Sequence, residues 1–209
     1  MKLLAPVLAA LVLAAPAFGD VGTATLAPAE DVSLPFFCDW GYDWDERCYR
    51  DDSDRLALGG EPDKIWRSAL RFSLGSIPAG AVVVTAELSL WYDGVCVGPR
   101  KTSRPCGGRP FELDAYRILT ARWFSEREVA IDPYGFAAYL GAFAPPQWIT
   151  WDVTDLAADW HARNVPNNGV LVQVADDQEA YDVPGPKVPS SGNADPALRP
   201  QLAVWWMTG

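Results

Sequence analysis

A chain of 209 residues can form one packed domain with a sizeable core, and it is short for two domains. Acidic residues outnumber basic residues by 27 to 17, and the formal net charge is −10 at pH 7. This balance argues against a nucleic-acid partner, because phosphate binding depends on Lys and Arg. The ten Trp side chains require a large core, a flat binding surface, or both.

The N-terminus carries the pattern of an export signal. One basic residue precedes the apolar run Leu3–Ala17, which is too short to cross a bilayer as a mature anchor. Small residues at Ala17 and Gly19 suit a signal peptidase that cuts before Asp20. We therefore predict a cleaved signal peptide at residues 1–19 and a secreted, extracellular monomer that does not insert into a membrane. The alternative is a buried N-terminal helix.

Four cysteines in an exported chain indicate two disulfides. Both Cys38 and Cys48, and Cys96 and Cys106, are ten residues apart, and each pair flanks a polar segment. We predict the local pairs Cys38–Cys48 and Cys96–Cys106, and the crossed pairings remain open. A zinc site is less well supported, because no Cys-x-x-Cys spacing occurs and His161 is the only His.

Most of the chain alternates apolar and polar residues with the period of a β-strand. In Ile65–Leu74 the large apolar side chains share one face, and Arg67 and Arg71 lie on the other. In Ala81–Tyr92 one face has Val82, Val84, Ala86, Leu88 and Leu90, and the opposite face has Val83, Thr85, Glu87, Ser89 and Trp91. Further strands are predicted at Phe111–Leu119, Val129–Ile131, Gln147–Asp152, Gly169–Ala175 and Gln201–Met207. One apolar face per strand requires a second sheet to cover it, so we predict an all-β sandwich of two antiparallel sheets.

One short helix interrupts the strands. Val153, Leu156, Ala157 and Trp160 recur at helical spacing, which predicts a helix at about 153–163 with this face packed on the sheet. Thr154 is its predicted N-cap. We expect Trp160 to be buried as core and to take no part in binding.

No linker that would separate domains follows the predicted signal peptide. Residues 20–55 are predicted to form an N-terminal strand and a disulfide-closed acidic loop, within the same domain as residues 56–209. Asp182–Ala197, rich in Pro, Gly and Ser, is predicted to be a loop before the last strand.

Several segments match, in their order along the chain, the pattern of a known family. They are Trp66–Leu74, Ile77–Ala81, Ala86–Leu90, Trp123–Glu126, Trp151–Thr154 with Trp160, Asn167–Val170, Ser190–Gly192 and Arg199–Leu202. Together they resemble the DNRLRE domain, which is closely related to carbohydrate-binding module family 96. The resemblance covers residues 56–207, and the inserts Gly94–Pro110 and Pro133–Pro146 are longer than the family pattern.

This resemblance implies a jelly-roll-like β-sandwich of a kind found in exported bacterial and archaeal proteins. Members often accompany polysaccharide-degrading or cell-surface domains, and some bind acidic polysaccharide such as alginate. The acidic charge of this chain weakens the expectation of an alginate-type ligand.

Sugar binding on a sandwich requires flat aromatic side chains and fixed polar groups. Trp91, Trp148 and Trp205 fall on the outward phase of their predicted strands. Arg67 and Arg71 share an outward face and could bind hydroxyls or a carboxylate. These five residues are the carbohydrate-binding candidates. The alternative is that a second layer covers them and that they only pack.

Acidic residues are dense around the first predicted disulfide. Asp43, Asp45 and Asp51 could bind a structural calcium ion, which prefers six to eight oxygen ligands. The alternative is a solvated acidic loop. No other cofactor is expected.

Signs of catalysis are weak. His161 is the only imidazole and no Gly-x-Ser-x-Gly motif occurs, so a catalytic triad has no support. Glu126 and Glu128 would lie ~7 Å apart on one face of an extended segment, a spacing that could suit a glycosidase.

The sequence leaves three functional hypotheses open. The leading hypothesis is a secreted, non-catalytic, carbohydrate-binding-like module that associates with extracellular or cell-surface polysaccharide. The second is a structural extracellular or envelope protein that binds protein partners. The third is a cryptic glycosidase or lyase, which a deep cleft containing Glu126 and Glu128, or a Tyr–Arg pair, would support.

Overall fold

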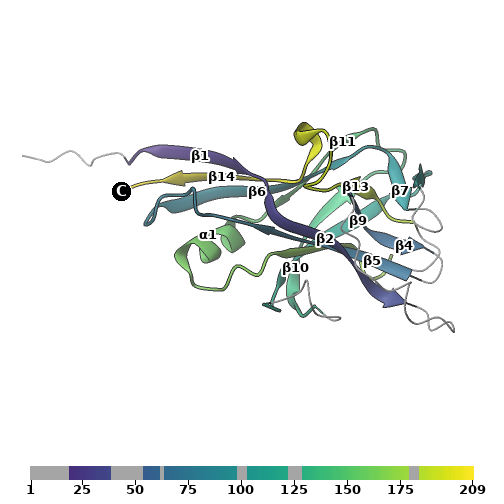
Figure 1. The fold of residues 1–209 in the computed structure, drawn as a ribbon, viewed down its shortest axis with the longest axis horizontal. Helices are drawn as coiled ribbons and strands as arrows, with labels where there is room; N and C mark the ends of the chain where they lie inside the picture. The colour runs from purple at the N-terminus through teal and green to yellow at the C-terminus, as the bar shows by residue number, and fades with distance from the viewer. Residues whose placement is uncertain (1–18, 39–53, 62–63, 98–102, 122–128, 179–183) are drawn as a thin grey trace, which may run out of the picture.

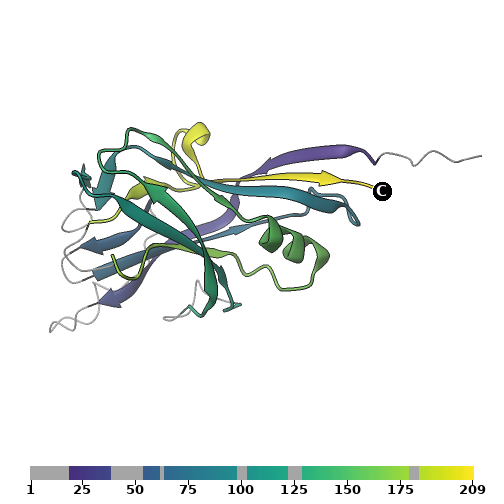
Figure 2. The same cartoon turned by 180° about the vertical axis from the view of Figure 1, so that it is seen from behind.

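The computed structural model describes residues 19–38, 54–61, 64–97, 103–121, 129–178 and 184–209. Most of them form antiparallel strands in two larger sheets (Figures 1 and 2). The four-stranded sheet has the order β1 (Val21–Leu26), β14 (Gln201–Met207), β6 (Val82–Tyr92) and β11 (Gln147–Asp152). The six-stranded sheet has the order β10 (Ile131–Leu140), β9 (Phe111–Ile118), β12 (Val170–Val174), β5 (Lys64–Phe72) and β2 (Pro28–Cys38), and β4 (Gly59–Glu61) also pairs with β5.

The chain winds between these sheets as a jelly roll. It starts in the four-stranded sheet with β1, enters the six-stranded sheet with β2 and β5, and returns with β6. The strands β9 and β10, then β11, then β12, then β14 continue this alternation. Strand β5 is additional to the eight-stranded pattern and lies between β2 and β12. The predicted sandwich of two antiparallel sheets is confirmed.

Two small strand pairs lie beside the main sheets: β13 (Lys187–Pro189) with β3 (Arg55–Ala57), and β7 (Val95–Val97) with β8 (Ser103–Pro105). Strand β13 lies within Asp182–Ala197, the segment predicted to be a loop, and a short 3-10 turn at Pro196–Leu198 overlaps the end of this segment. Strand β10 extends through Pro133, well past the three residues predicted for it. Proline is tolerated there because β10 is an edge strand, whose outer backbone groups need no partner strand.

The inward-facing side chains of the two sheets form one core. Leu88 and Leu90 of β6, Leu113 of β9 and Trp151 of β11 are all almost completely buried within it. The Nε1–H of Trp151 donates a 2.9 Å hydrogen bond to the backbone oxygen of Leu113. One indole therefore joins the two sheets by packing and by a hydrogen bond.

The one α-helix in the described ranges, α1 (Thr154–Ala162), covers the inner face of the part of the four-stranded sheet that projects beyond the six-stranded sheet (Figures 1 and 2). Leu156, Ala157 and Trp160 are buried, as the helical spacing predicts. The predicted N-cap is wrong by one residue: the N-cap is Val153, without a side-chain cap. The hydroxyl of Thr154 instead donates to Asp152 at 2.6 Å and accepts from the backbone N–H of Ala86 at 2.9 Å.

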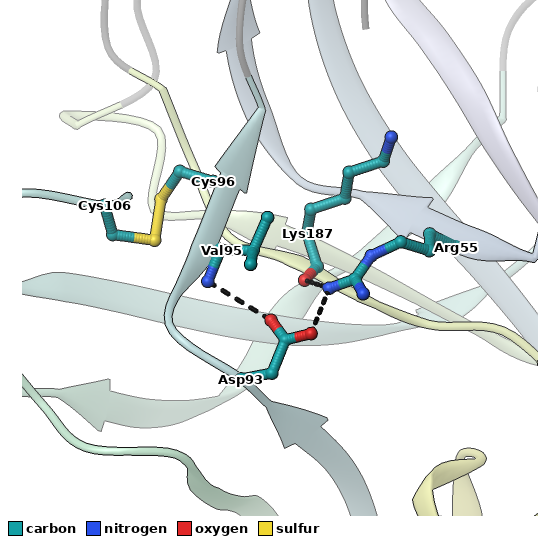
Figure 3. Close-up of polar contacts among 6 residues, drawn as sticks. All are labelled: Arg55, Asp93, Val95, Cys96, Cys106 and Lys187. Atoms are coloured by element: carbon teal, nitrogen blue, oxygen red, sulfur yellow. Dashed lines mark hydrogen bonds and ion pairs between the residues drawn. A yellow bond between two sulfur atoms is a disulfide. The ribbon is translucent and has the colours of Figure 1, made fainter. Parts of the chain in front are cut away.

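Cys96 and Cys106 form a disulfide with a Cα–Cα distance of 4.8 Å, as predicted (Figure 3). It joins β7 to the residue that follows β8. The other predicted disulfide, Cys38–Cys48, lies outside the residues whose side chains the structure describes. Figure 3 also draws the polar contacts near this disulfide, all of which meet at Asp93 or at the Arg55 guanidinium beside it.

Asp93 follows β6 directly and fixes the end of this strand. One of its carboxylate oxygens accepts a 2.7 Å hydrogen bond from the Arg55 guanidinium, and the other accepts from the Val95 backbone N–H at 3.2 Å (Figure 3). The same Arg55 nitrogen donates to the backbone oxygen of Lys187 at 2.7 Å. These contacts tie β6 to β3, β13 and β7, and they hold the strand end that carries Trp91.

Candidate functional site

Three of the predicted binding residues lie on one surface, the outer face of the four-stranded sheet. Trp91 of β6 and Trp148 of β11 are register partners, and their ring centroids are 5.5 Å apart at an interplanar angle of 69°. Trp205 of β14 is 39% exposed and lies opposite Thr85 of β6. The alternation along each strand thus predicts the phase of all three indoles correctly. We call this surface the tryptophan face.

The register gives the order of residues between the indoles. Starting from the Trp91 and Trp148 row, the next row across the sheet holds Gln201, Ser89 and Thr150. The row after it holds Thr25, Ala203, Glu87 and Asp152. It is followed by a row with Thr23, Trp205 and Thr85, and finally by Val21, Met207 and Val82. The tryptophan face therefore has aromatic side chains toward both ends and hydroxyl, amide and carboxylate groups between them.

A β-bulge changes the end of this face. Trp205 pairs with Thr85 whereas Trp206 pairs with Val83, so Val84 is an extra residue on β6. Side-chain alternation reverses across such an insertion. The prediction that Val82 and Val84 point inward and Val83 outward is therefore wrong: Val82 and Val84 are exposed, and Val83 is buried.

The bulge lies at a shallow groove of about 420 Å³ on the tryptophan face. Its lining residues are Val21, Val84, Thr85, Glu87, Trp205, Trp206 and Met207. On the inner side of the sheet, a Cβ atom at Gly22 would lie only 2.4 Å from the Trp206 ring. Glycine at this position thus lets the buried Trp206 ring pack closely against β1.

The four described strands give the tryptophan face negative charge and no basic side chain. The four strands of the sheet contain no Lys, Arg or His, and their two carboxylates, Glu87 and Asp152, are register partners. Asp152 accepts hydrogen bonds from the Thr154 hydroxyl at 2.6 Å and from the Thr154 backbone N–H at 3.0 Å. These two bonds hold the pKa of Asp152 below its usual value. Asp152 is therefore ionised at neutral pH and cannot serve as a proton donor.

The two arginine candidates do not join the indoles. Arg67 and Arg71 belong to β5, on the outer face of the six-stranded sheet, at the opposite side of the sandwich. Arg67 was expected to be exposed and is only 7% exposed; its guanidinium lies 3.2 Å from Asp176. Arg71 forms an ion pair with Glu30 of β2 at 2.6 Å.

A second polar cluster, which was not among the predicted sites, surrounds Arg67. Gln173 of β12 is fully buried and donates to Asp176 at 2.6 Å. Asp114 is the register partner of Gln173, and it accepts a 3.0 Å hydrogen bond from the Tyr116 hydroxyl. This cluster could have been predicted in part, because alternation in Phe111–Leu119 places Glu112, Asp114 and Tyr116 on one face of the strand.

Burial controls the protonation of this cluster. It raises the pKa of Asp114, and nearby carboxylates add to this effect although the Tyr116 hydrogen bond opposes it. Burial, together with the hydrogen bond to Asp114, raises the pKa of Tyr116 to about 12. A phenol with such a pKa is a poor general base near neutral pH, so the Tyr–Arg pair of a lyase gains no support here.

Tyr116 should make the protein less stable in alkali. In the unfolded chain a Tyr loses its proton near pH ~10, whereas the folded protein holds that of Tyr116 until about pH 12. The stabilisation from Tyr116 is thus complete below pH ~10 and is lost between pH ~10 and ~12. We expect the melting temperature of the wild type to fall more steeply across this range than that of Tyr116→Phe. A melting-temperature difference that stays constant from pH 9 to pH 12 would contradict this assignment.

The remaining candidates from the sequence are the calcium ligands, the acid pair and His161. The predicted calcium ligands Asp43, Asp45 and Asp51, and the acid pair Glu126 and Glu128, lie outside the described residues. Within the described ranges no group of three or more His, Cys, Asp or Glu residues is placed to hold a metal ion. His161 lies in the last turn of α1 and is partly buried.

No family model matches the chain, and no curated protein is significantly similar to it. The resemblance to DNRLRE domains therefore rests on the ordered sequence segments and remains a prediction. None of the helices in the described part of the chain is long and apolar enough to cross a membrane.

Proposed function

We propose that the protein is a secreted, non-catalytic carbohydrate-binding module, and that polysaccharide binds across the tryptophan face. The observation that carries this proposal is the placement of Trp91, Trp148 and Trp205 on one face, with hydrogen-bonding side chains between them. Indole faces stack on the apolar faces of sugar rings, and hydroxyl, amide and carboxylate groups bind the ring hydroxyls.

The dimensions of the tryptophan face suit an extended ligand. Trp91 is six residues along β6 from Thr85, the partner of Trp205, which corresponds to ~20 Å at the usual strand rise. The T-shaped Trp91–Trp148 pair forms one end of this span, and the groove beside Trp205 forms the other. A polysaccharide segment of several sugar rings could contact both ends.

Two features favour binding over catalysis at this face. The groove on this surface is shallow, whereas glycosidases enclose the bond that they cleave. Asp152, whose pKa is lowered, is ionised at neutral pH and so cannot be the general acid of a carboxylate pair. The Glu87–Asp152 pair is therefore better suited to accepting hydrogen bonds.

The export proposal rests on the N-terminal sequence and gains support from the disulfide. The Cys96–Cys106 bond is compatible with an oxidising extracellular environment. The DNRLRE resemblance points to the same setting, because these domains occur in exported proteins. We propose free secretion or non-covalent association with surface polysaccharide.

The test is retention of the purified protein by polysaccharides in affinity electrophoresis and on a glycan array. We expect at least one polysaccharide to retain the wild type, and Trp91→Ala and Trp205→Ala to weaken retention at least tenfold. The matched control is Tyr134→Ala, which removes an aromatic side chain that is 83% exposed on β10 of the other sheet. Equal retention of all four proteins would contradict binding at the tryptophan face.

A further inference from the structure

We infer that the ligand of the tryptophan face is a neutral polysaccharide, whose hydroxyl groups donate hydrogen bonds to Glu87 and Asp152. This inference rests on the proposed function and adds the chemical class of the ligand. It departs from the acidic polysaccharide that the DNRLRE resemblance suggests.

The charge of the tryptophan face favours a neutral ligand. A uronate or sulfate group requires a cationic partner, most often Arg or Lys, to replace its water. The four strands supply none, and two carboxylates stand directly opposite each other near the centre of the face. The nearest basic residue in sequence is Arg199, two positions before β14, and its Nε donates to the Asn193 backbone oxygen at 2.8 Å. On the four described strands, a polyanion would thus meet like charges and no compensating cation.

The facing carboxylates Glu87 and Asp152 repel each other. Like charges on directly opposed residues of antiparallel strands destabilise a sheet. Asp152 is nevertheless held in its charged form by the two hydrogen bonds from Thr154. The core gains nothing from Glu87 or Asp152, because both side chains are exposed. A binding role accounts for Glu87, whose charge directly opposite Asp152 is one that folding alone would disfavour.

The two carboxylates also lie between the aromatic ends of the tryptophan face. The Glu87 and Asp152 row lies two residues from the Trp205 row and four residues from the Trp91 row along β6 and β14. These separations correspond to ~7 Å and ~13 Å. A sugar chain stacked on both aromatic ends would therefore pass directly over the carboxylates. Hydrogen bonds from its hydroxyls to ionised acceptors are roughly twice as strong as bonds between neutral groups.

The experiment compares neutral polysaccharides (cellulose, xylan, mannan and mixed-linkage β-glucan) with acidic ones (alginate and polygalacturonate). Binding is measured with the full protein at low and at physiological salt. We expect retention by a neutral polysaccharide that changes less than twofold with salt, because no ion pair is screened. Glu87→Gln and Asp152→Asn should each weaken it at least fivefold, and the double variant should weaken it further.

Folding is measured on the same variants. Glu87→Gln should melt at or slightly above the wild-type temperature, because it removes the repulsion from Asp152. A lower melting temperature would indicate a structural role for Glu87 and would overturn the assignment of the pair to ligand binding. Unchanged neutral binding in the double variant would overturn it as well.

The outcomes separate this inference from the proposed function. Binding of alginate or polygalacturonate that is lost in Trp91→Ala would overturn the neutral class and leave the tryptophan face as the binding site. Binding to none of the polysaccharides would overturn both.

Discussion

Replacing Trp160 with alanine should lower the free energy of unfolding by about 3–5 kcal/mol. The indole is 5% exposed and belongs to the main core, where α1 packs against the inner face of the four-stranded sheet. Truncation removes the transfer free energy of the ring and leaves a cavity that the surrounding strands can fill only in part. A loss of this size is a large fraction of the stability of an ordinary domain.

Denaturant melts of Trp160→Ala and Trp91→Ala test this prediction. Trp91 is partly exposed on the tryptophan face, so Trp91→Ala should cost much less stability. It should instead lose polysaccharide affinity, which Trp160→Ala should keep at temperatures where it remains folded. A Trp160→Ala protein that melts like the wild type, beside an unfolded Trp91→Ala, would show that the inner and outer faces are inverted.

Replacing Trp151 with alanine should cost as much or more. Its indole is 1% exposed, and its Nε1–H supplies the hydrogen bond to the Leu113 oxygen that joins the two sheets. The variant therefore forms a cavity and also leaves a buried carbonyl without its partner, which adds about 1–3 kcal/mol to the cavity cost.

A pair of phenylalanine variants separates packing from hydrogen bonding. Trp151→Phe keeps an aromatic ring but loses the bond to Leu113. In Trp160, by contrast, Nε1 has no hydrogen-bond partner among the described residues. Trp160→Phe should therefore cost less than Trp151→Phe in chemical denaturation, although both rings are buried. Equal costs would mean that the bond to Leu113 contributes no stability.

The sequence predicts the main features of the tryptophan face because they depend on local periodicity. Residues two apart on a strand share a face whichever strand lies beside them. The outward phase of Trp91, Trp148 and Trp205 therefore follows from each strand alone. The helical repeat that places Trp160 inward is equally local. That the three strands are neighbours in one sheet depends on their pairing, which the alternation does not specify.

Other features depend on contacts between distant segments. The bulge at Val84 arises from the register between β6 and β14, and a pattern within β6 does not reveal it. The burial of Arg67 has the same origin. Its strand β5 lies inside the six-stranded sheet, and its outer face carries a second apolar cluster that contains Ala69 and Leu171. The alternation within β5 alone therefore predicts one exposed face, although neighbouring residues cover both faces of this strand.

The central claim is that polysaccharide binds across the tryptophan face, and the most direct test is to observe the indole groups during binding. Each Trp gives one indole N–H signal in a ¹⁵N NMR spectrum, and site-directed replacement assigns these signals. Titration with a retained neutral polysaccharide should shift the signals of Trp91, Trp148 and Trp205 and leave those of the buried Trp66, Trp151 and Trp160 in place. Shifts confined to the backbone of β5, β9 and β12, with these three indoles unchanged, would place the ligand on the opposite sheet and contradict the account.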